Sequence, residues 1–525
     1  MRSIAVGGLA ALVLALGGAP GSRAQSEYGA YLEPVDGQVL QGIGQFLSAN
    51  ADYLEDLDDL SATEPVPWPA TQLIFVNITP EDDPPGHAFV DADQLAAPLA
   101  TMAAAGRIPV ISVSFKGPPG AGYPDPVEYE VETACDYVLV GPSSGGKDNM
   151  EYRLSELGEA IAEFGKPVFV RLGVEINNVS THHVTGGPIF IWHDDVEGYH
   201  PYIFPECYRR ARELIEDAGA IRCSYIWCWQ ASAPTDYDDV DPTEGPKWYP
   251  GDEYVDWFGL DVFAVNEFTT NDSPINNAGS KLAAIEAFLD FADETDRPVF
   301  LAESSCVDFP ILPSQAPSGP TDPSGSWDNW FEPFLGFVAA HESIKAITYI
   351  SWDWNEGGGP DNWLDGTITN NDEVMGKWID ELLDPKFLQA GAGDDDGQLN
   401  GYDGWYFLDD ALAGTHGDPL MLGIGPVVPG GSIELKLLNA KANANAYLVV
   451  GATETNASFK GGVLVPSVDT VIPNLSTGSG GTVSLPTTWQ TGVSSGFTLY
   501  FQFWIPDSAG PQSFAASNGL AGVTL

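Results

Sequence analysis

The sequence predicts a (β/α)8 barrel followed by a smaller all-β sandwich domain. In the first part of the chain, short apolar runs typical of strands alternate with stretches whose apolar residues recur every three or four positions, as in helices. Near-continuous apolar strands that alternate with helices indicate a parallel sheet covered on both faces. Eight or nine such units over roughly 360 residues fit a closed barrel better than an open sheet. After about residue 415 the helical period disappears, and short strands separated by Gly, Pro, Ser and Thr predict the sandwich.

Nine apolar runs are candidate strands of the barrel, and one of them is expected to be an extra strand. They are 28–32 (YGAYL), 73–78 (LIFVNI), 108–115 (IPVISVSF), 137–141 (YVLVG), 168–176 (VFVRLGVEI), 222–230 (RCSYIWCWQ), 255–263 (VDWFGLDVF), 299–304 (VFLAES) and 346–354 (AITYISWDW). Helices are expected at 151–164, 207–218, 281–293 and 327–341, where apolar residues follow the helical period.

The chain is expected to contain four segments. Arg2 precedes an apolar run at 4–16, and Ser22-Arg23-Ala24 offers small residues for cleavage, so residues 1–24 are predicted to be a secretory signal peptide. No later run is apolar enough to span a bilayer, so we expect a secreted protein with no transmembrane span. The other segments are a barrel domain at 25–388, a Gly/Asp-rich linker at 389–414 and a β-sandwich at 415–525, with strands in SIELKLLN, AYLVVG, TVSLP and FTLYFQFWI.

The chain is strongly acidic. Its 525 residues carry 74 acidic against 21 basic side chains, a formal net charge of −53, while 44% hydrophobic residues and 15 Trp supply a globular core. Such a surface repels nucleic acids and anionic membranes and favours a neutral or cationic partner. Adaptation to salty or harsh surroundings is the simpler explanation of the acid excess.

No metal, cofactor or disulfide framework is expected. The five cysteines are odd in number and lack zinc-type spacings, and Cys223 and Cys228 have opposite parity in one apparent strand, so buried thiols are favoured. Two clusters could bind a metal but fit other roles better. They are Asp394, Asp396, Asn400 and Asp403, which miss the EF-hand spacing and fit a solvated linker, and His182, His183, His193, Asp194 and Asp195, which fit a polar substrate wall.

The run VFVRLGVEINN (168–178) changes character along its length. If it is a strand, one face is apolar throughout, whereas the other passes from Phe169 through Arg171 and Gly173 to Glu175 and Asn177. In parallel barrels the active site lies at the carboxyl ends of the strands. A strand whose polar end faces such a site would have this pattern.

A second carboxylate and several aromatic residues are predicted at the same end of the barrel. Glu303 ends the run 299–304, where it shares a face with Val299 and Leu301. Paired carboxyls cleave glycosidic bonds and indole faces stack on sugars, so this pattern favours a carbohydrate hydrolase. Arg171 is too far along its strand, about 13 Å at strand rise, to neutralise Glu175 directly. The residues expected to line the substrate site are Arg171, Asn177, Trp229, Asp261, Phe263, Trp352, Asp353 and Trp354; Trp227, Trp248 and Trp363 could be sugar platforms or core.

The segment 28–385 resembles glycoside hydrolase family 26, which includes β-mannanases. The resemblance rests on YGAYL, MEYRLSELGEAIAEFGKPVFVRLGVEINN, PECYRRARELIEDAGAIRCSYIWCW, RPVFLAESS and above all WYPGDEYVDWFGLDVF at 248–263. It implies a retaining barrel enzyme of clan A, with Glu175 as acid/base and Glu303 as nucleophile. A retaining mechanism requires the two carboxyls to lie about 5–5.5 Å apart.

Two positions depart from the family pattern. Val174 stands where the family has a His before the acid/base, and Phe263 stands where it has a Tyr. These changes imply another substrate, other residues in the same roles, or lost catalysis. The C-terminal part, notably LYFQFWIPDSAGPQSFAASNGL, resembles a β-sandwich module of secreted bacterial proteins, which implies no defined ligand.

The expected function is therefore that of a secreted, monomeric, retaining endo-β-glycoside hydrolase. Its substrate would be a neutral polysaccharide or oligosaccharide, with β-mannan first and β-1,3-xylan or mixed-linkage β-glucan behind. Two alternatives stay open: a non-catalytic glycan-binding barrel, suggested by Val174 and Phe263, and a structural envelope protein that uses the C-terminal module.

Overall fold

The structure is a computed structural model with two compact units, one formed by Gln38–Ala392 and one that includes Gly393–Leu525. No helix in the described part of the chain is both long and apolar enough to cross a membrane. The described residues are 28, 30–34, 37–44, 49–78, 94–115, 146–176, 204–220, 222–231, 237, 239–242, 245–275, 279–312, 325–355, 363–391, 404–408, 410–424, 427–478 and 480–524.

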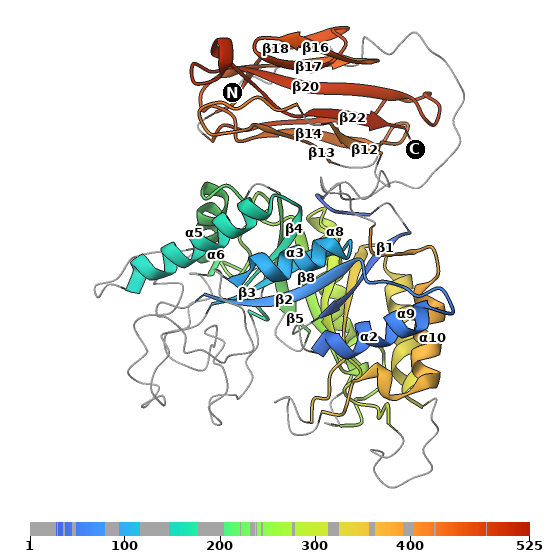
Figure 1. Cartoon of the computed structure of the whole chain (residues 1–525). Helices are drawn as coiled ribbons and strands as arrows, with labels where there is room; N and C mark the ends of the chain where they lie inside the picture. Colours follow the sequence, from blue (N-terminus) through green and yellow to red (C-terminus); the bar gives the residue numbers. More distant parts are fainter. Residues whose placement is uncertain are drawn as a thin grey trace. The chain divides into compact units, whose positions relative to one another are not determined.

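The first unit is a closed parallel barrel, which confirms the predicted fold (Figure 1). Its strands in order are β1 (Val39–Gly44), β2 (Thr71–Ile78), β3 (Ile108–Phe115), β4 (Val168–Leu172), β5 (Cys223–Gln230), β8 (Trp257–Val262), β9 (Val299–Ser304) and β10 (Ile344–Ile350). Pairing of β10 with β1 closes the sheet. The short strand β11 (Phe387–Leu388) pairs with β1 from outside the ring, and β6 (Val240–Asp241) pairs with β7 (Gly245–Pro246).

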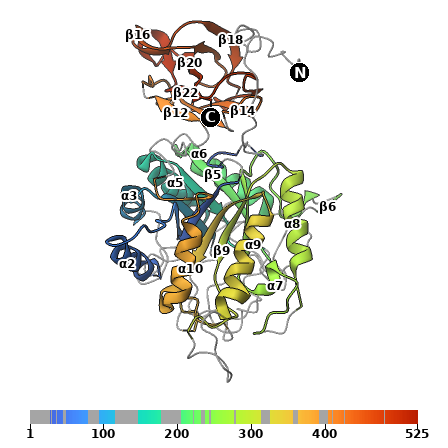
Figure 2. The ribbon, with the colours of Figure 1, turned by 90° about the vertical axis from the view of Figure 1, so that its right-hand side faces the viewer.

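Helices surround the barrel (Figure 2). They are α2 (Ala49–Ser61), α3 (Ala96–Ala104), α5 (Gly146–Phe164), α6 (Phe204–Asp217), α7 (Val265–Phe268), α8 (Leu282–Glu294), α9 (Glu332–Ala340) and α10 (Asp372–Leu382), with the π-helix η5 (Trp327–Phe331) leading into α9 and the 3-10 turn η6 (Ile368–Asn370) before α10. All four predicted helices are present. The side chain of Asn371 caps α10 by accepting from the backbone N–H groups of Glu373 and Val374 at 3.1 and 3.2 Å, which satisfies donors that have no partner inside the helix.

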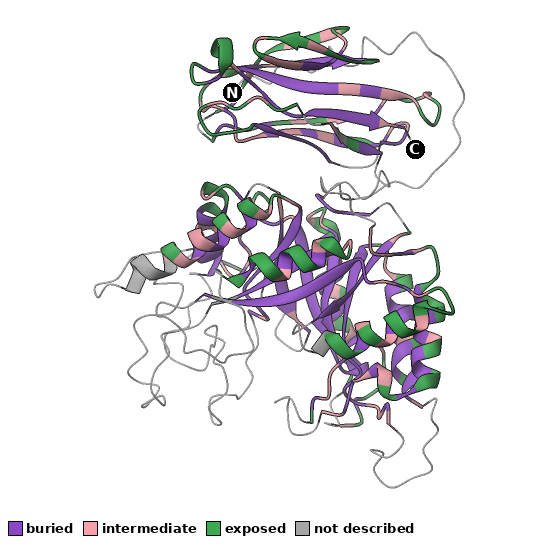
Figure 3. Ribbon diagram, in the orientation of Figure 1, coloured by how far each residue is buried: buried purple, intermediate pink, exposed green. Residues whose placement is uncertain are grey.

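The barrel strands are buried on both faces (Figure 3), as their near-continuous apolar character predicts. In β4 the side chains of Val168, Val170 and Leu172 point outward into the core shared with the helices. Phe169 points inward and packs edge-on against Trp257 of β8, with ring centroids 5.3 Å apart. Arg171 shares this inward face, so strand parity places its guanidinium inside the barrel.

The prediction for the first strand is wrong. The described residues of 28–32 form a turn in which Leu32 has a φ of 65° and the carboxylate of Glu33 accepts from the N–H of Ala30 at 2.8 Å. The first strand is β1, whose run VLQGIG gives a weak signal because two of its six residues are Gly. One of them, Gly42, is required by close packing, since a Cβ there would lie 2.0 Å from Oγ1 of Thr71. The candidate strand 137–141 lies outside the described residues.

The second unit contains two antiparallel sheets around one core, as predicted for a β-sandwich. The sheets have the orders β12-β22-β20-β15-β18, with β21 on β20, and β13-β14-β19, and β16 pairs with β17 in a separate hairpin. Their bounds are β12 (Trp405–Leu408), β13 (Leu420–Ile424), β14 (Ser432–Leu438), β15 (Asn445–Gly451), β16 (Glu454–Phe459), β17 (Gly462–Pro466), β18 (Thr470–Ser476), β19 (Val483–Thr488), β20 (Thr498–Pro506), β21 (Phe514–Ala516) and β22 (Gly519–Val523). Strand β12 lies inside the expected linker at 389–414, and its Trp405 is buried in the core between the sheets.

Candidate active site

A β-bulge directs Glu303 into the barrel. Leu301 of β9 pairs with Leu260 of β8, but the next pair is Glu303 with Asp261, so β9 contains one extra residue at this point. The pairing of β9 with β10 shifts at the same place. An extra residue reverses the alternation of side chains. Glu303 therefore points inward although Val299 and Leu301 point to the helices, which corrects the prediction that all three share a face.

Glu175 lies in a turn after β4, not within the strand. The strand ends at Leu172, four residues earlier than the predicted end of the run, and Gly173 follows with a φ of 82°. Glu175 itself has a φ of 45°, a left-handed conformation that side chains other than Gly seldom adopt. Glu175 is partly exposed, in contrast to the buried Val174 before it. The turn thus presents a carboxyl group at the carboxyl end of the fourth barrel strand.

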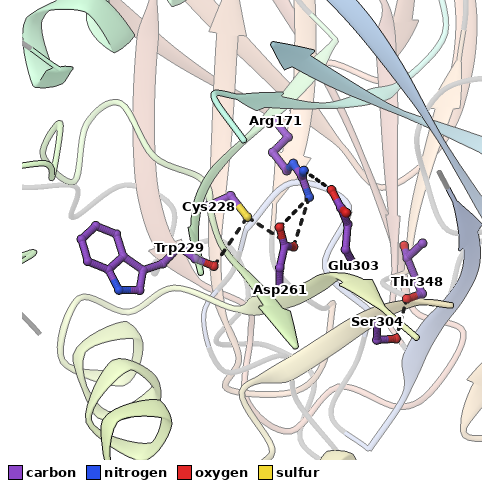
Figure 4. Close-up of polar contacts among 7 residues, drawn as sticks. All are labelled: Arg171, Cys228, Trp229, Asp261, Glu303, Ser304 and Thr348. Carbon is purple, nitrogen blue, oxygen red and sulfur yellow. Dashed lines mark hydrogen bonds and ion pairs between the residues drawn. The ribbon is translucent and has the colours of Figure 1, made fainter. Parts of the chain in front are cut away.

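Arg171, Asp261 and Glu303 form a buried ionic cluster between β4, β8 and β9 (Figure 4). Nη1 of Arg171 donates to both carboxylate oxygens of Asp261, at 3.1 and 3.4 Å, and Nη2 forms an ion pair with Oε1 of Glu303. Sγ of Cys228 on β5 donates to Oδ1 of Asp261 at 3.5 Å. A single Glu at a strand end commonly forms an ion pair with an Arg. Glu303 forms such a pair with Arg171, and it is also the predicted nucleophile.

Burial and charge act in opposite directions within this cluster. Burial raises the pKa of Asp261 well above its ordinary value, and the negative charges of Glu303 and Glu175 add to the rise, whereas Arg171 opposes it. Burial lowers the pKa of Arg171, but the two carboxylates outweigh it, so the guanidinium stays charged. Because the negative charge of Glu175 helps to raise the pKa of Asp261, Glu175 interacts electrostatically with this cluster.

Three aromatic rings pack together beyond the ends of β8 and β10. The ring of Phe263 lies 4.8 Å from that of Trp363 and 5.8 Å from that of Trp354. Nε1 of Trp354 donates to Oγ of Ser305 at 2.9 Å, and this hydroxyl donates to the carbonyl of Ile350. Trp354 is buried, whereas Trp352 and Trp363 are partly exposed at the edge of this cluster. The partly exposed rings are the ones that could contact a sugar.

Trp227 and Trp229 occupy a different position. Both point outward from β5 into the core shared with the helices, where Trp227 stacks on Phe288 of α8. Trp229 is 3% exposed and packs edge-on against Tyr237 and Trp248. The structure therefore places Trp229 away from the inward face that carries Arg171 and Cys228.

The remaining predicted residues are scattered. Oδ1 of Asp353 accepts from the backbone N–H and the side-chain amide of Asn355, each at 3.0 Å, which stabilises the turn after β10. Asn177, the histidine-rich loop, the acidic linker cluster and Cys135 lie outside the described residues. The other four cysteines are free thiols, and Cys223 is partly exposed. Of the predicted site residues, the structure gathers Arg171, Asp261 and Glu303 by direct contact.

Two members of the site were missed by sequence reasoning. Sequence analysis treats Cys228 as a buried thiol with no part in the site, although its parity in β5, opposite to that of Trp227 and Trp229, places it on the inward face. Ser305 carried no signal, because its role depends on the position of Trp354.

Part of this chain is similar to known proteins. Residues 100–298 match the model of glycosyl hydrolase family 26. The chain is 28% identical over 311 residues to the β-1,3-xylanase TXYA of a Vibrio species, covering 53% of this chain and 60% of the relative. It is 26% identical over 294 residues to a β-1,3-xylanase of an Alcaligenes species, covering 51% and 55%. The chain thus spans less than two thirds of the length of these relatives.

Among solved structures, a double mutant of the endo-β-1,4-mannanase of Cellulomonas fimi matches with a TM-score of 0.45 and 15% identity, over 96% of this chain and 100% of the other. The catalytic domain of an endo-β-1,4-mannanase of a Bacillus species matches with a TM-score of 0.44 and 18% identity, over 70% and 94%. The match of residues 100–298 to the family model confirms that this part of the chain resembles glycoside hydrolase family 26.

Proposed function

We propose that this protein is a retaining endo-β-glycoside hydrolase with Glu175 as acid/base and Glu303 as nucleophile. The observation that carries the proposal is the bulge in β9, which turns Glu303 into the barrel beside Asp261 and onto Arg171. Glu175 follows the fourth strand of the ring, and Glu303 is the last residue but one of the seventh. Carboxyl ends of barrel strands are the usual position of catalytic groups.

The chemistry requires one carboxyl group that donates a proton and one that attacks. A carboxylate oxygen of Glu303 bonds to the anomeric carbon while the bond from that carbon to the leaving oxygen breaks, and the leaving oxygen takes the proton of Glu175. Glu175 then accepts a proton from water, whose oxygen displaces Glu303 from the sugar. The surroundings of the two residues fit these roles. Glu303 is buried beside the permanent positive charge of Arg171, which suits a carboxylate that attacks, and Glu175 is partly exposed, which suits a group that exchanges protons with water.

For the substrate we propose a neutral β-glycan, with β-1,3-xylan first. Both curated relatives are named as β-1,3-xylanases, which moves this polymer ahead of the β-mannan favoured by sequence analysis. The net charge of −53 disfavours an anionic polymer. The proposal includes secretion, directed by residues 1–24, and action as a monomer.

A non-catalytic glycan-binding barrel is the alternative that a specific observation favours. Val174 is 3% exposed and apolar, so it offers no hydrogen bond beside Glu175. Phe263 likewise places a ring without a hydroxyl group in the aromatic cluster. This alternative predicts glycan binding without cleavage.

Reducing-sugar release from β-1,3-xylan, β-mannan, glucomannan and mixed-linkage β-glucan tests the proposal. We expect release by the wild type and a loss of at least about 10⁴-fold in Glu303→Gln, as when a nucleophile is removed. The matched control is Glu286→Gln, at an exposed position on α8, which should retain full activity. Binding without release by the wild type would support the non-catalytic barrel.

A further inference from the structure

Asp261 is built into the barrel in a way that prevents contact with a substrate. Its side chain is fully buried, and both its oxygens accept hydrogen bonds from Arg171. A third donor, the thiol of Cys228, reaches Oδ1 at 3.5 Å. A carboxylate with these contacts and no exposure can act on the reaction only through its neighbours, although sequence analysis assigned Asp261 to substrate binding.

The packing around Cys228 fixes the direction of its thiol. Gly259 of β8 pairs with Cys228, and a Cβ at Gly259 would lie 3.0 Å from Sγ and 2.7 Å from Cγ2 of Ile226. Glycine at this position therefore makes room for the Cys228 side chain on the inward face. The thiol points toward Asp261, two residues further along β8 (Figure 4).

A continuous chain of contacts connects Cys228 to Glu303. Cys228 contacts Asp261, Asp261 holds Nη1 of Arg171, and Nη2 of the same guanidinium holds Glu303. A guanidinium is planar and rigid, so fixing one of its nitrogens fixes the direction of the other. The orientation of Arg171 thus depends on Asp261, and the position of the Glu303 carboxylate depends on Arg171.

We propose that Asp261 and Cys228 are positioning residues for Glu303, acting through Arg171. The inference deepens the proposed function and rests on it, because it assumes that Glu303 is the nucleophile. Misplacing a reacting group by about 1 Å can cost on the order of 100-fold in rate, so such positioning is large enough to measure.

Electrostatics supports the same assignment. Two buried carboxyls share one guanidinium, and burial raises the pKa of Asp261. The groups that act on Asp261 come from every side: Arg171 on β4, Glu175 after it, Cys228 on β5 and Glu303 on β9. Replacing Asp261 by a neutral residue should therefore remove its ionisation from the site.

The test compares Asp261→Asn with the wild type on the glycan that the wild type cleaves best. We expect kcat to fall about 100-fold with KM nearly unchanged, because the substrate contacts remain while the nucleophile loses its alignment. The dependence of kcat/KM on pH should also lose one ionisation. Partial unfolding alone would lower the amount of active enzyme without changing the shape of the pH profile.

A second set of variants avoids removing a buried charge. Cys228→Ala should lower kcat by up to about tenfold, the size of one lost hydrogen bond, whereas Cys228→Ser keeps a donor and should restore most of it. The matched control is Cys207→Ala, since Cys207 is an equally buried thiol on α6. It should leave kcat per folded molecule and the pH profile unchanged.

The outcomes separate the two proposals. An active wild type with unchanged kcat and pH profile in Asp261→Asn would overturn the positioning role and leave the proposed function intact. A rise in KM at unchanged kcat would instead restore Asp261 to substrate binding. A wild type that cleaves none of the glycans would overturn the proposed function, and the positioning role with it.

Discussion

Asp261 of β8 and Glu303 of β9 are cross-strand neighbours. The preceding pair is Leu260 with Leu301, so β9 has one residue more than β8 between the two pairs. The extra residue between them in β9 brings two carboxyls side by side inside the barrel. Two buried carboxylates side by side repel each other and destabilise the fold unless a cation lies between them. Arg171 is that cation, so this pair explains why a guanidinium is buried completely.

The first prediction concerns the stability that Arg171 provides. Arg171→Met should lower the free energy of unfolding by roughly 3–5 kcal/mol, because it leaves Asp261 and Glu303 buried without a cation. Arg171→Lys should be less harmful to stability but should still lower kcat, since an ammonium group lacks the planar fork that holds both carboxylates. Urea denaturation measures the first effect and initial rates the second.

A matched control exists on α5 and α6. Arg210 also contacts two carboxylates, Glu151 at 3.0 Å and Glu213 at 3.4 Å, but its side chain is 36% exposed. Arg210→Met should therefore cost no more than about 1 kcal/mol. Equal losses in both Met variants would contradict a special role for burial at Arg171.

The second prediction separates the acid from the nucleophile. Glu175→Ala should lower the rate on polymeric glycan by about 10²–10⁴-fold, because the leaving oxygen then receives no proton from the enzyme. With a nitrophenyl glycoside of the same sugar the loss in the first step should be much smaller, since nitrophenolate leaves without protonation. Pre-steady-state release of nitrophenol provides the measurement. Equal losses on both substrates would argue against Glu175 as the acid.

The third prediction distinguishes two neighbouring tryptophans. Trp352 is partly exposed, so Trp352→Ala should raise KM by about two- to tenfold, the size of one aromatic contact. Trp354 is buried and bonded to Ser305, so Trp354→Ala should instead lower the free energy of unfolding by about 3–5 kcal/mol. Kinetics and thermal denaturation of both variants give the comparison, and a reversed pattern would move the sugar contact to Trp354.

The fourth prediction is a dependence of stability on pH. Burial, with a smaller contribution from Glu267, raises the pKa of Asp308 from its ordinary value of 3.8 to about 7, despite a hydrogen bond from the N–H of Val265. Between these values the folded state binds more protons at this site than the unfolded state does. Stability from Asp308 is therefore present at low pH and is lost as the pH rises from about 4 to about 7.

The expected loss at this site is about 4 kcal/mol, at roughly 1.4 kcal/mol for each unit of pKa. Asp308→Asn cannot ionise, so its free energy of unfolding should fall less steeply than that of the wild type across this interval. Chemical denaturation at several pH values measures the difference between the two curves. Parallel curves would mean that Asp308 keeps an ordinary pKa in the folded protein.

Much of the fold follows from local pattern. Apolar runs alternating with helical periods indicate a parallel barrel, because strands covered on both faces are apolar at most positions. The four predicted helices and the principal sandwich strands also follow from the spacing of apolar residues along the chain. The apolar pattern does not predict the strand at Val39–Gly44. Close packing at Gly42 requires a glycine, and glycine does not contribute to an apolar run.

Strand parity predicted part of the geometry of the candidate site. Strand parity correctly placed Arg171 inside the barrel, but it gave Glu303 the wrong face, because a bulge is a property of the pairing between strands. It also extended β4 through Glu175, where the chain turns with positive φ values at Gly173 and Glu175. The bulge has no signature in the residues themselves, and Gly173 is the one residue of the turn whose type favours a positive φ.

The sequence by itself determined the barrel, the sandwich and the presence of two glutamates at strand ends. Only the tertiary structure decided what surrounds them: Arg171 between Asp261 and Glu303, Cys228 behind Asp261, and Trp229 in the core. The physical reason is that hydrophobic period is a local property of the chain. A buried charge, by contrast, is satisfied by partners up to 132 residues away, which only the closed sheet brings into contact.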